Sequence, residues 1–136
     1  MVLRSFFESD SLPVLERVLA FTEARHRVLA ANVANVETPG YRRQDLAVGR
    51  FQGELERAIE RRRAAPGRFD MAETSAASGP RSSNLGMVRH DQNDLDLDRE
   101  MALLGRNALL HNTAAALARA KYNGLRLAIS GTLGNA

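Results

Sequence analysis

Two histidines are the side chains of this sequence best suited to bind a metal. His26 and His111 each fall at an interior position of a seven-residue apolar repeat, so pairing of the two repeats would bring the imidazoles together. Imidazole binds zinc well, but a zinc site takes at least three protein ligands. No third ligand is evident. The sequence therefore predicts no metal site and favours buried or interfacial polar side chains within a helix pair.

The acidic and hydroxyl residues lack the arrangement that ion binding or catalysis requires. Acids cluster between Asp91 and Glu100 without the glycine and spacing of a calcium loop, and helix capping explains them better. No nucleophile elbow or oxyanion motif surrounds Ser82, Ser83 and His90. The chain has no cysteine and so no thiolate chemistry. We expect no catalytic residue, no cofactor and no enzyme activity.

The charge distribution argues against nucleic-acid binding. The net charge of +3 arises within residues 37–90, where ten arginines are mixed with seven acids. Nucleic-acid surfaces are basic faces with aromatic platforms, whereas aromatic residues make up only 5% of this chain. Residues 1–10 contain no apolar run long enough for a signal-peptide core or a membrane span. We therefore expect no direct membrane span and, if the protein is exported, no cleaved signal peptide.

Two long helices, expected over 11–36 and 91–130, must position these residues. Asp10 or Ser11 is the candidate N-cap of the first, and Pro13 is tolerated in its first turn. Both helices carry apolar residues at alternating spacings of three and four, which is typical of coiled coils. The first stripe comprises Leu12, Leu15, Leu19, Thr22, His26, Leu29, Val33 and Val36. The second comprises Leu97, Met101, Leu104, Ala108, His111, Ala115, Ala118, Tyr122, Leu125 and Ile129.

The middle of the chain is predicted to be less regular. A turn is expected over 37–47, because proline cannot continue a helix and glycine permits a tight turn. Phe51, Leu55 and Ile59 are four residues apart and indicate a short helix over 48–63. Residues 64–90 are rich in glycine, proline, serine and alanine, and we expect a flexible insert there.

These elements predict an elongated, all-α protein with a single domain over 1–136, in which the terminal helices form an antiparallel coiled-coil pair. The predicted seam of this pair comprises Leu12, Leu15, Leu19, Leu29, Val33, Val36, Leu97, Met101, Leu104, Tyr122, Leu125 and Ile129. Matching Leu12 with Ile129 brings Thr22 opposite Ala118. Off the stripes, a second set is expected to stay exposed in a monomer and to imply partners: Val14, Val18, Phe21, Val28, Leu103, Leu110, Leu117 and Leu127.

The most informative stretch is the junction ANVANVETPGY over 31–41. A helix stop followed by a turn accounts for its proline and glycine. It leaves open why Asn32 and Asn35, which are poor helix formers, lie three residues apart just before the stop. Their amides could bond across an interface.

This stretch resembles the N-terminal motif of flagellar rod and hook proteins, Asn-x-Ala-Asn-x-x-Thr-Pro-Gly-Tyr. The matching residues are Asn32, Ala34, Asn35, Thr38, Pro39, Gly40 and Tyr41. Arg42 follows where lysine is usual, which keeps the charge. The length of 136 residues resembles the short proximal-rod members, and the acidic segment 94–100 resembles one short type. The helix segment typical of the related FlgC type is not found, although a FlgC-like subunit or another coiled-coil adaptor remains the alternative.

The resemblance implies a structural subunit that is exported by the flagellar type III apparatus and assembles helically through its terminal helices. It places such a protein in the rod of the basal body, within the periplasmic space. The partners it implies are like subunits, other rod proteins of the FlgC and FlgF types, FliE, and components of the export gate and MS ring. It implies neither a cofactor nor nucleic acid.

Overall fold

The computed structural model of the chain describes residues 11–64, 81–82 and 96–132. Most of these residues are helical, which confirms the all-α fold class. The helices are α2 (Ser11–Ala34), α3 (Val48–Ala64) and α5 (Leu97–Thr132). Between them lie two short strands, β1 (Gln44–Asp45) and β2 (Arg81–Ser82), which pair antiparallel with Gln44 opposite Ser82.

The helix boundaries follow local hydrogen bonding. α2 ends at Ala34, two residues before its predicted end, because residues 35–38 form turn hydrogen bonds instead. α5 begins at Leu97, and Asp96 caps it by accepting the backbone N–H of Asp98 at 3.2 Å. The predicted start at 91 and most of the predicted insert over 64–90 lie outside the described residues. Within that insert, residues 81–82 form β2.

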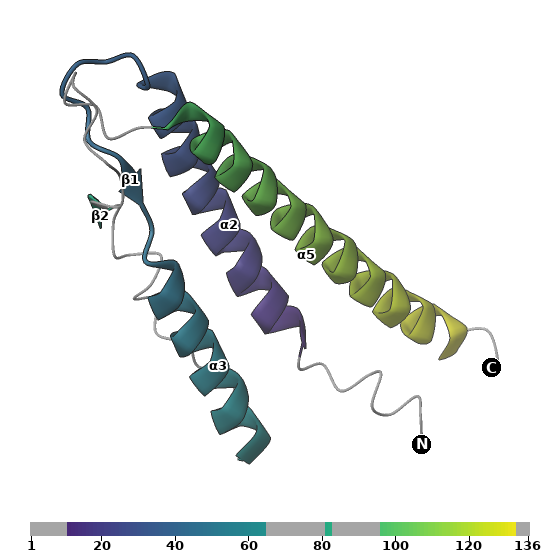
Figure 1. The fold of residues 1–136 in the computed structure, drawn as a ribbon. Coiled ribbons are helices and arrows are strands. Elements are labelled where there is room, and N and C mark those ends of the chain that lie inside the picture. Colours follow the sequence, from purple (N-terminus) through teal and green to yellow (C-terminus); the bar gives the residue numbers. More distant parts are fainter. Residues whose placement is uncertain (1–10, 65–80, 83–95, 133–136) are drawn as a thin grey trace.

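Figure 1 shows α2 lying between α3 and α5, with α5 antiparallel to α2. The α2–α5 pair is the most extensive helix packing in the described chain. With 36 residues α5 is about 54 Å long, whereas the 24 residues of α2 span about 36 Å. The long pair gives the molecule its elongated form, while the supercoiling of a coiled coil stays a prediction. No described helix has the length and apolar content needed to cross a membrane.

A compact hydrophobic core lies between α2 and α3. The rings of Phe21 and Phe51 stack with their centroids 4.0 Å apart, and Leu46 and Ala58 are buried beside them. Val18 and Val28 pack against this cluster. The prediction that Val18, Phe21 and Val28 stay exposed in a monomer is therefore wrong. The short helix α3 covers that face of α2, which the thin apolar stripe of α3 did not indicate.

The pairing of α2 with α5 differs from the predicted register by one heptad. The side chain of Thr22 contacts His111, whereas matching the large apolar residues placed Thr22 opposite Ala118. α5 also turns a slightly different face toward α2. Its buried residues are Glu100, Asn107, Ala114 and Ala118. Three of these replace the predicted Met101, Ala108 and Ala115, because two polar side chains, Glu100 and Asn107, have partners on the α2 side.

The stacked rings generate a first prediction. Phe51→Ala removes a buried aromatic side chain and should lower the free energy of unfolding by about 3–5 kcal/mol. Arg57→Ala, on an exposed position of the same helix, should change it by less than about 0.5 kcal/mol. Urea unfolding followed by circular dichroism measures both. Equal effects of the two substitutions would show that α3 contributes no core.

Candidate functional site

The motif residue Asn32 lies at the centre of a buried polar cluster. Its side chain is 0% exposed, although it belongs to the end of α2. The amide nitrogen donates to the carbonyl of Gln44 at 2.7 Å and to Oε2 of Glu100 at 2.9 Å. The amide oxygen accepts the N–H of Gln44 at 3.1 Å and the hydroxyl of Tyr41 at 3.3 Å. Asn32 thereby joins α2, the motif turn and α5, with every hydrogen-bonding position of the amide satisfied.

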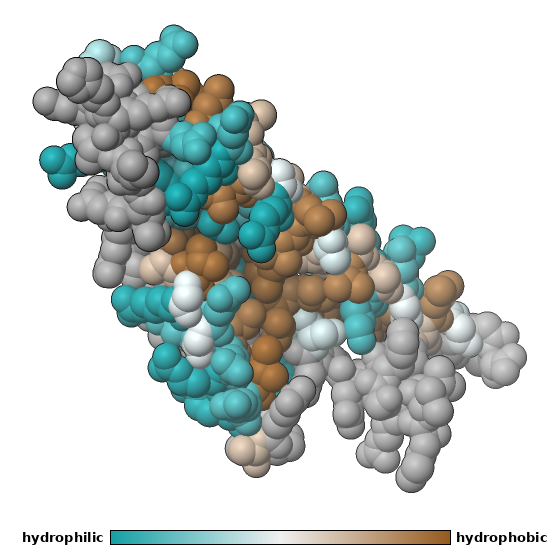
Figure 2. Space-filling view, viewed as in Figure 1, coloured by the Kyte–Doolittle hydropathy of each residue, from teal (hydrophilic) through white to brown (hydrophobic). Residues whose placement is uncertain are grey.

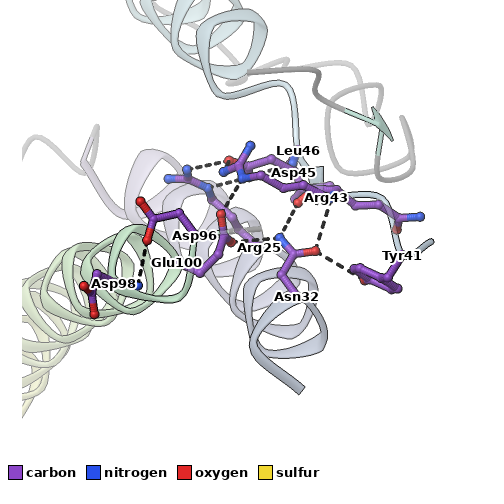
Figure 3. A network of polar contacts seen from close by, with 10 residues as sticks. Arg25, Asn32, Tyr41, Arg43, Asp45, Leu46, Asp96, Asp98 and Glu100 are labelled. Atoms are coloured by element: carbon purple, nitrogen blue, oxygen red, sulfur yellow. Dashed lines mark hydrogen bonds and ion pairs between the residues drawn. The ribbon is translucent and has the colours of Figure 1, made fainter. Parts of the chain in front are cut away.

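Two arginines and two carboxylates complete this cluster (Figure 3). The Nε atom of Arg43 is hydrogen-bonded to Oε1 of Glu100, which is 1% exposed. Arg43 also contacts Asp45 at 3.3 Å. Arg25 of α2 donates to both carboxylate oxygens of Asp45 at 2.8 Å, a bidentate pairing. The two positive and two negative charges balance, which is the condition under which buried ions are tolerated.

The cluster shifts the titration of Asp45. Burial by itself would raise the pKa of its carboxyl group, but the hydrogen bond and charge of Arg25 act in the opposite direction. The backbone N–H of Leu46 and the charge of Arg43 add to the effect of Arg25. Together they lower the pKa of Asp45 below its ordinary value of 3.8. Asp45 is therefore ionised at neutral pH and stays paired with Arg25.

The other motif residues form the turn that carries the chain out of α2. The Asn35 amide donates to the carbonyl of Ala31 at 2.8 Å, and its oxygen accepts the Thr38 hydroxyl at 3.2 Å. Gly40 has a φ of 73°, a left-handed conformation that favours glycine. Ala34 and Pro39 are exposed. Of the two asparagines, Asn32 bonds across a helix interface and Asn35 bonds only locally.

A second polar contact lies midway along the helix pair. The Thr22 hydroxyl is hydrogen-bonded with Nδ1 of His111 at 2.9 Å and lies 2.8 Å from the carbonyl of Val18 and 3.0 Å from that of Leu19. The buried Asn107 amide donates to the Thr22 carbonyl at 2.8 Å. His26 is exposed, which contradicts its predicted interior position, and lines a shallow groove of about 330 Å³ together with His111.

No ligand set forms in this groove. Among residues 11–64, 81–82 and 96–132, no group of three or more histidines or acidic side chains is arranged to hold a metal ion.

The predicted seam residues occupy different environments. Leu29 is fully buried, and several others are half-buried: Leu12, Leu15, Leu19, Val33, Val36, Leu104 and Leu125. Leu97, Met101, Tyr122 and Ile129 are exposed instead. Tyr122 nevertheless borders the helix pair, because its hydroxyl donates to Oε1 of Glu16 on α2 at 3.0 Å. As a two-helix seam in a single chain, the prediction is wrong for Leu97, Met101 and Ile129.

Sequence reasoning did not place Arg25, Arg43, Asp45, Glu100 or Asn107 in a buried cluster. One signal was present for the last two. Glu100 and Asn107 share the seven-residue spacing of Ala114 and alternate with Leu104 and His111, so the same stripe includes them. The predicted stripe instead took the neighbouring Met101 and Ala108, which fits the usual exposure of polar residues. No sequence pattern pointed to the pairing of Arg25 with Asp45.

The antiparallel pair of long helices ends at the turn whose motif, over residues 32–41, resembles that of flagellar rod and hook proteins. No protein-family model matches the chain. The chain is similar to the flagellar basal body rod protein FlgB of Cereibacter sphaeroides, with 30% identity over 90% of this chain and 95% of the relative. FlgB of Bacillus subtilis is 24% identical over the same shares of the two chains. FlgB of Salmonella typhimurium is 28% identical over 85% of this chain and 90% of the relative.

These similarities extend over most of the chain. The chain belongs to the FlgB family of flagellar basal body rod proteins.

Asn32 should be far less replaceable than Asn35. Asn32→Ala leaves the Gln44 backbone groups and one oxygen of Glu100 without their partner, and should lower the free energy of unfolding by about 2–5 kcal/mol. Asn35→Ala removes only local bonds and should cost about 1 kcal/mol or less. Chemical unfolding of the two variants measures the difference. A larger loss from Asn35→Ala would contradict the central position of Asn32.

The Asp45 pairing predicts a specific pH dependence. Because the folded pKa of Asp45 is depressed, its contribution to stability is present above the unfolded value of 3.8 and is lost as the pH falls through the lower folded value. Asp45→Asn should therefore lower the urea midpoint at pH 7, and its deficit relative to the parent chain should shrink below pH 3.8. A deficit that is the same at pH 7 and pH 3 would show that charge pairing at Asp45 does not stabilise the fold.

Proposed function

We propose that this chain is a structural subunit of the proximal flagellar rod that assembles with its neighbours through the surfaces of its long helices. FlgB-family membership places it among rod proteins. The observation that carries the mode of assembly is the apolar surface of α5, which the described part of the chain leaves open. The exposed large apolar residues on α5 are Leu97, Met101, Leu109, Leu110, Leu117, Tyr122, Leu127 and Ile129.

The arrangement of these residues supports contacts on more than one side of α5. Leu110 and Leu117 are 51% and 53% exposed and, with the half-buried Leu103, recur every seven residues along one flank of the helix. Leu109 and Leu127 lie on the side opposite α2, by the 100° rotation per residue of an α-helix. Figure 2 shows apolar side chains running as a band along the molecule. A helix that is apolar on several sides is typical of a helix buried among others.

The proposal includes the partners that the family resemblance implies. Like subunits, rod proteins of the FlgC and FlgF types and FliE would contact the helices, and the subunit would help to connect the export gate and the MS-ring base to the rod. Export by the flagellar type III apparatus would deliver the chain to the periplasmic section of the rod. The motif residues 32–41 would hold one end of the helix pair in a fixed geometry, and neighbouring subunits would contact the pair at that end.

An acidic residue on the exposed flank of α5 tests this proposal. Leu110→Asp and Leu117→Asp should leave the fold intact, since both side chains are half exposed in the single chain. Each should strongly reduce incorporation into the rod, because a charge in a buried contact costs several kcal/mol unless it is paired. Each variant is expressed in a strain lacking the native protein, and its amount in extracted basal bodies is measured.

Two further variants control this experiment. Asn123→Asp introduces the same charge at an exposed polar position of α5 and should permit incorporation. Leu29→Asp, at a fully buried position, should unfold the helix pair and abolish incorporation for a different reason, visible as lost helical content. Normal rods built from both Leu110→Asp and Leu117→Asp would rule out this flank of α5 as an assembly surface.

A further inference from the structure

Polar contacts run along the whole α2–α5 pair. Four hydrogen bonds join the helices: Asn32 to Glu100, Thr22 to His111, Asn107 to the Thr22 carbonyl, and the exposed Tyr122 hydroxyl to Glu16. The first three involve buried residues and belong to one register, in which Thr22 lies beside His111. The same register places Leu15 opposite Ala118, because each is seven residues from that pair.

Apolar burial alone does not favour this register. The half of the α5 stripe formed by Leu104, His111, Ala118 and Leu125 repeats every seven residues, so a slip of one heptad preserves the contact pattern. Such a slip of about 10 Å would also bring Tyr122 opposite Leu19 and Ile129 opposite Leu12. In the observed register Tyr122 and Ile129 remain 52% and 67% exposed. The slipped pairing would therefore bury more apolar surface and should be preferred if burial decided the outcome.

The polar residues, unlike the apolar ones, do not repeat. A one-heptad slip would carry Glu100 beyond Asn32 and bring Asn107 or Ala108 opposite Asn32 instead. Arg43 and Asn32 would lose their bonds to Glu100, and the Thr22 carbonyl would lose the Asn107 amide. Arg43 would keep Asp45 and Asn32 would keep Gln44, but Glu100 would lose both of these partners. Because these groups are buried, the loss of their hydrogen bonds is costly. A buried polar residue at one position of a repeat is a known means of specifying register.

We infer that the buried polar residues Asn32, Arg43, Glu100 and Asn107 act as a register lock that selects this pairing of α2 with α5 over the slipped one. The lock also determines which apolar side chains of α5 are left for neighbours, since a slip would move Ile129 under α2 and would bury more of the Tyr122 ring, whose hydroxyl already contacts Glu16. This second consequence rests on the proposed function, whereas the register itself does not.

Cysteine pairs in the full-length chain can report the register, because the chain has no cysteine of its own. Leu15→Cys with Ala118→Cys reports the observed register, and Leu15→Cys with Leu125→Cys reports the slipped one. A disulfide needs Cβ atoms roughly 4 Å apart, so a shift of one heptad separates the two reporters. In the parent chain, the first pair should form the intramolecular disulfide at least about tenfold faster than the second.

The lock is then replaced by apolar residues as a set, so that no buried ion is left unpaired. In a chain carrying Asn32→Leu, Arg43→Met, Glu100→Leu and Asn107→Ala, the tenfold preference should fall to about one or reverse. A chain carrying Ala31→Leu and Asn123→Leu, two exposed positions on the same helices, should keep the preference. Only the monomer-sized product on a denaturing gel is counted, so the result does not depend on rod assembly.

Three results would overturn the inference. The first is an unchanged preference in the fourfold variant, which would show that apolar packing sets the register. The second is loss of helical circular dichroism in that variant together with loss of both disulfides, which would assign the cluster to stability rather than register. The third is a parent chain that forms neither disulfide. Loss of rod incorporation with an unchanged preference would contradict the lock and leave the proposed function standing.

Discussion

The structure depends on the carboxylate of Glu100, a buried charge near the start of α5. An isolated carboxylate in a protein interior would cost several kcal/mol, so the fold must bring a cation and hydrogen-bond donors to it. Arg43 and Asn32 meet that requirement, and both lie at the opposite end of the sequence. Satisfying this one group therefore fixes the end of α2, the path of the motif turn and the start of α5 relative to one another.

The three helices have unequal roles around this constraint. α2 is covered on two sides, by the aromatic cluster with α3 and by α5, and its buried residues reflect both contacts. α5 uses one narrow face made of small and polar residues, including Ala114 and Ala118, which let it approach α2 closely. Leu104 and Leu125 are half-buried on this face, whereas most other large apolar side chains of α5 are exposed. The single chain thus stabilises α2 through its own contacts, while the surface of α5 is suited to contacts with other molecules.

Much of this architecture could be predicted from the sequence, for identifiable reasons. The heptad spacing indicated both long helices, and the proline and glycine of the motif located the turn between α2 and α3. The antiparallel arrangement also followed from two matching stripes at opposite ends of the chain. The predicted register and the predicted face of α5 were wrong, because the stripe took Met101 and Ala108 in place of Glu100 and Asn107. Their burial depends on Arg43, Asn32 and Thr22, which are distant in sequence and were not linked to them by any pattern.

The role of α3 and the charged cluster escaped prediction for a related reason. Phe21 lies off the apolar stripe of α2 that was predicted to face the C-terminal helix. Its partner is instead Phe51 of α3, and no local sequence pattern indicates that the two rings stack. Likewise, Arg25 and Asp45 are 20 residues apart and become partners only after the turn has reversed the chain. Periodicity describes what one helix can bury on one face. It does not describe a helix with two covered faces or an ion pair formed across a turn.

The motif gains a physical meaning from this arrangement. Asn32 is 68 residues from Glu100, and Arg43 is 57 residues from it, so the polar cluster can form only when both terminal helices are present. Contacts over such separations are formed at the expense of considerable chain entropy and cannot be made by either end alone. The turn with Gly40 and the local bonds of Asn35 hold the loop in a shape that returns Gln44 to Asn32. The motif is therefore both the end of one helix and the place where the other helix is recognised.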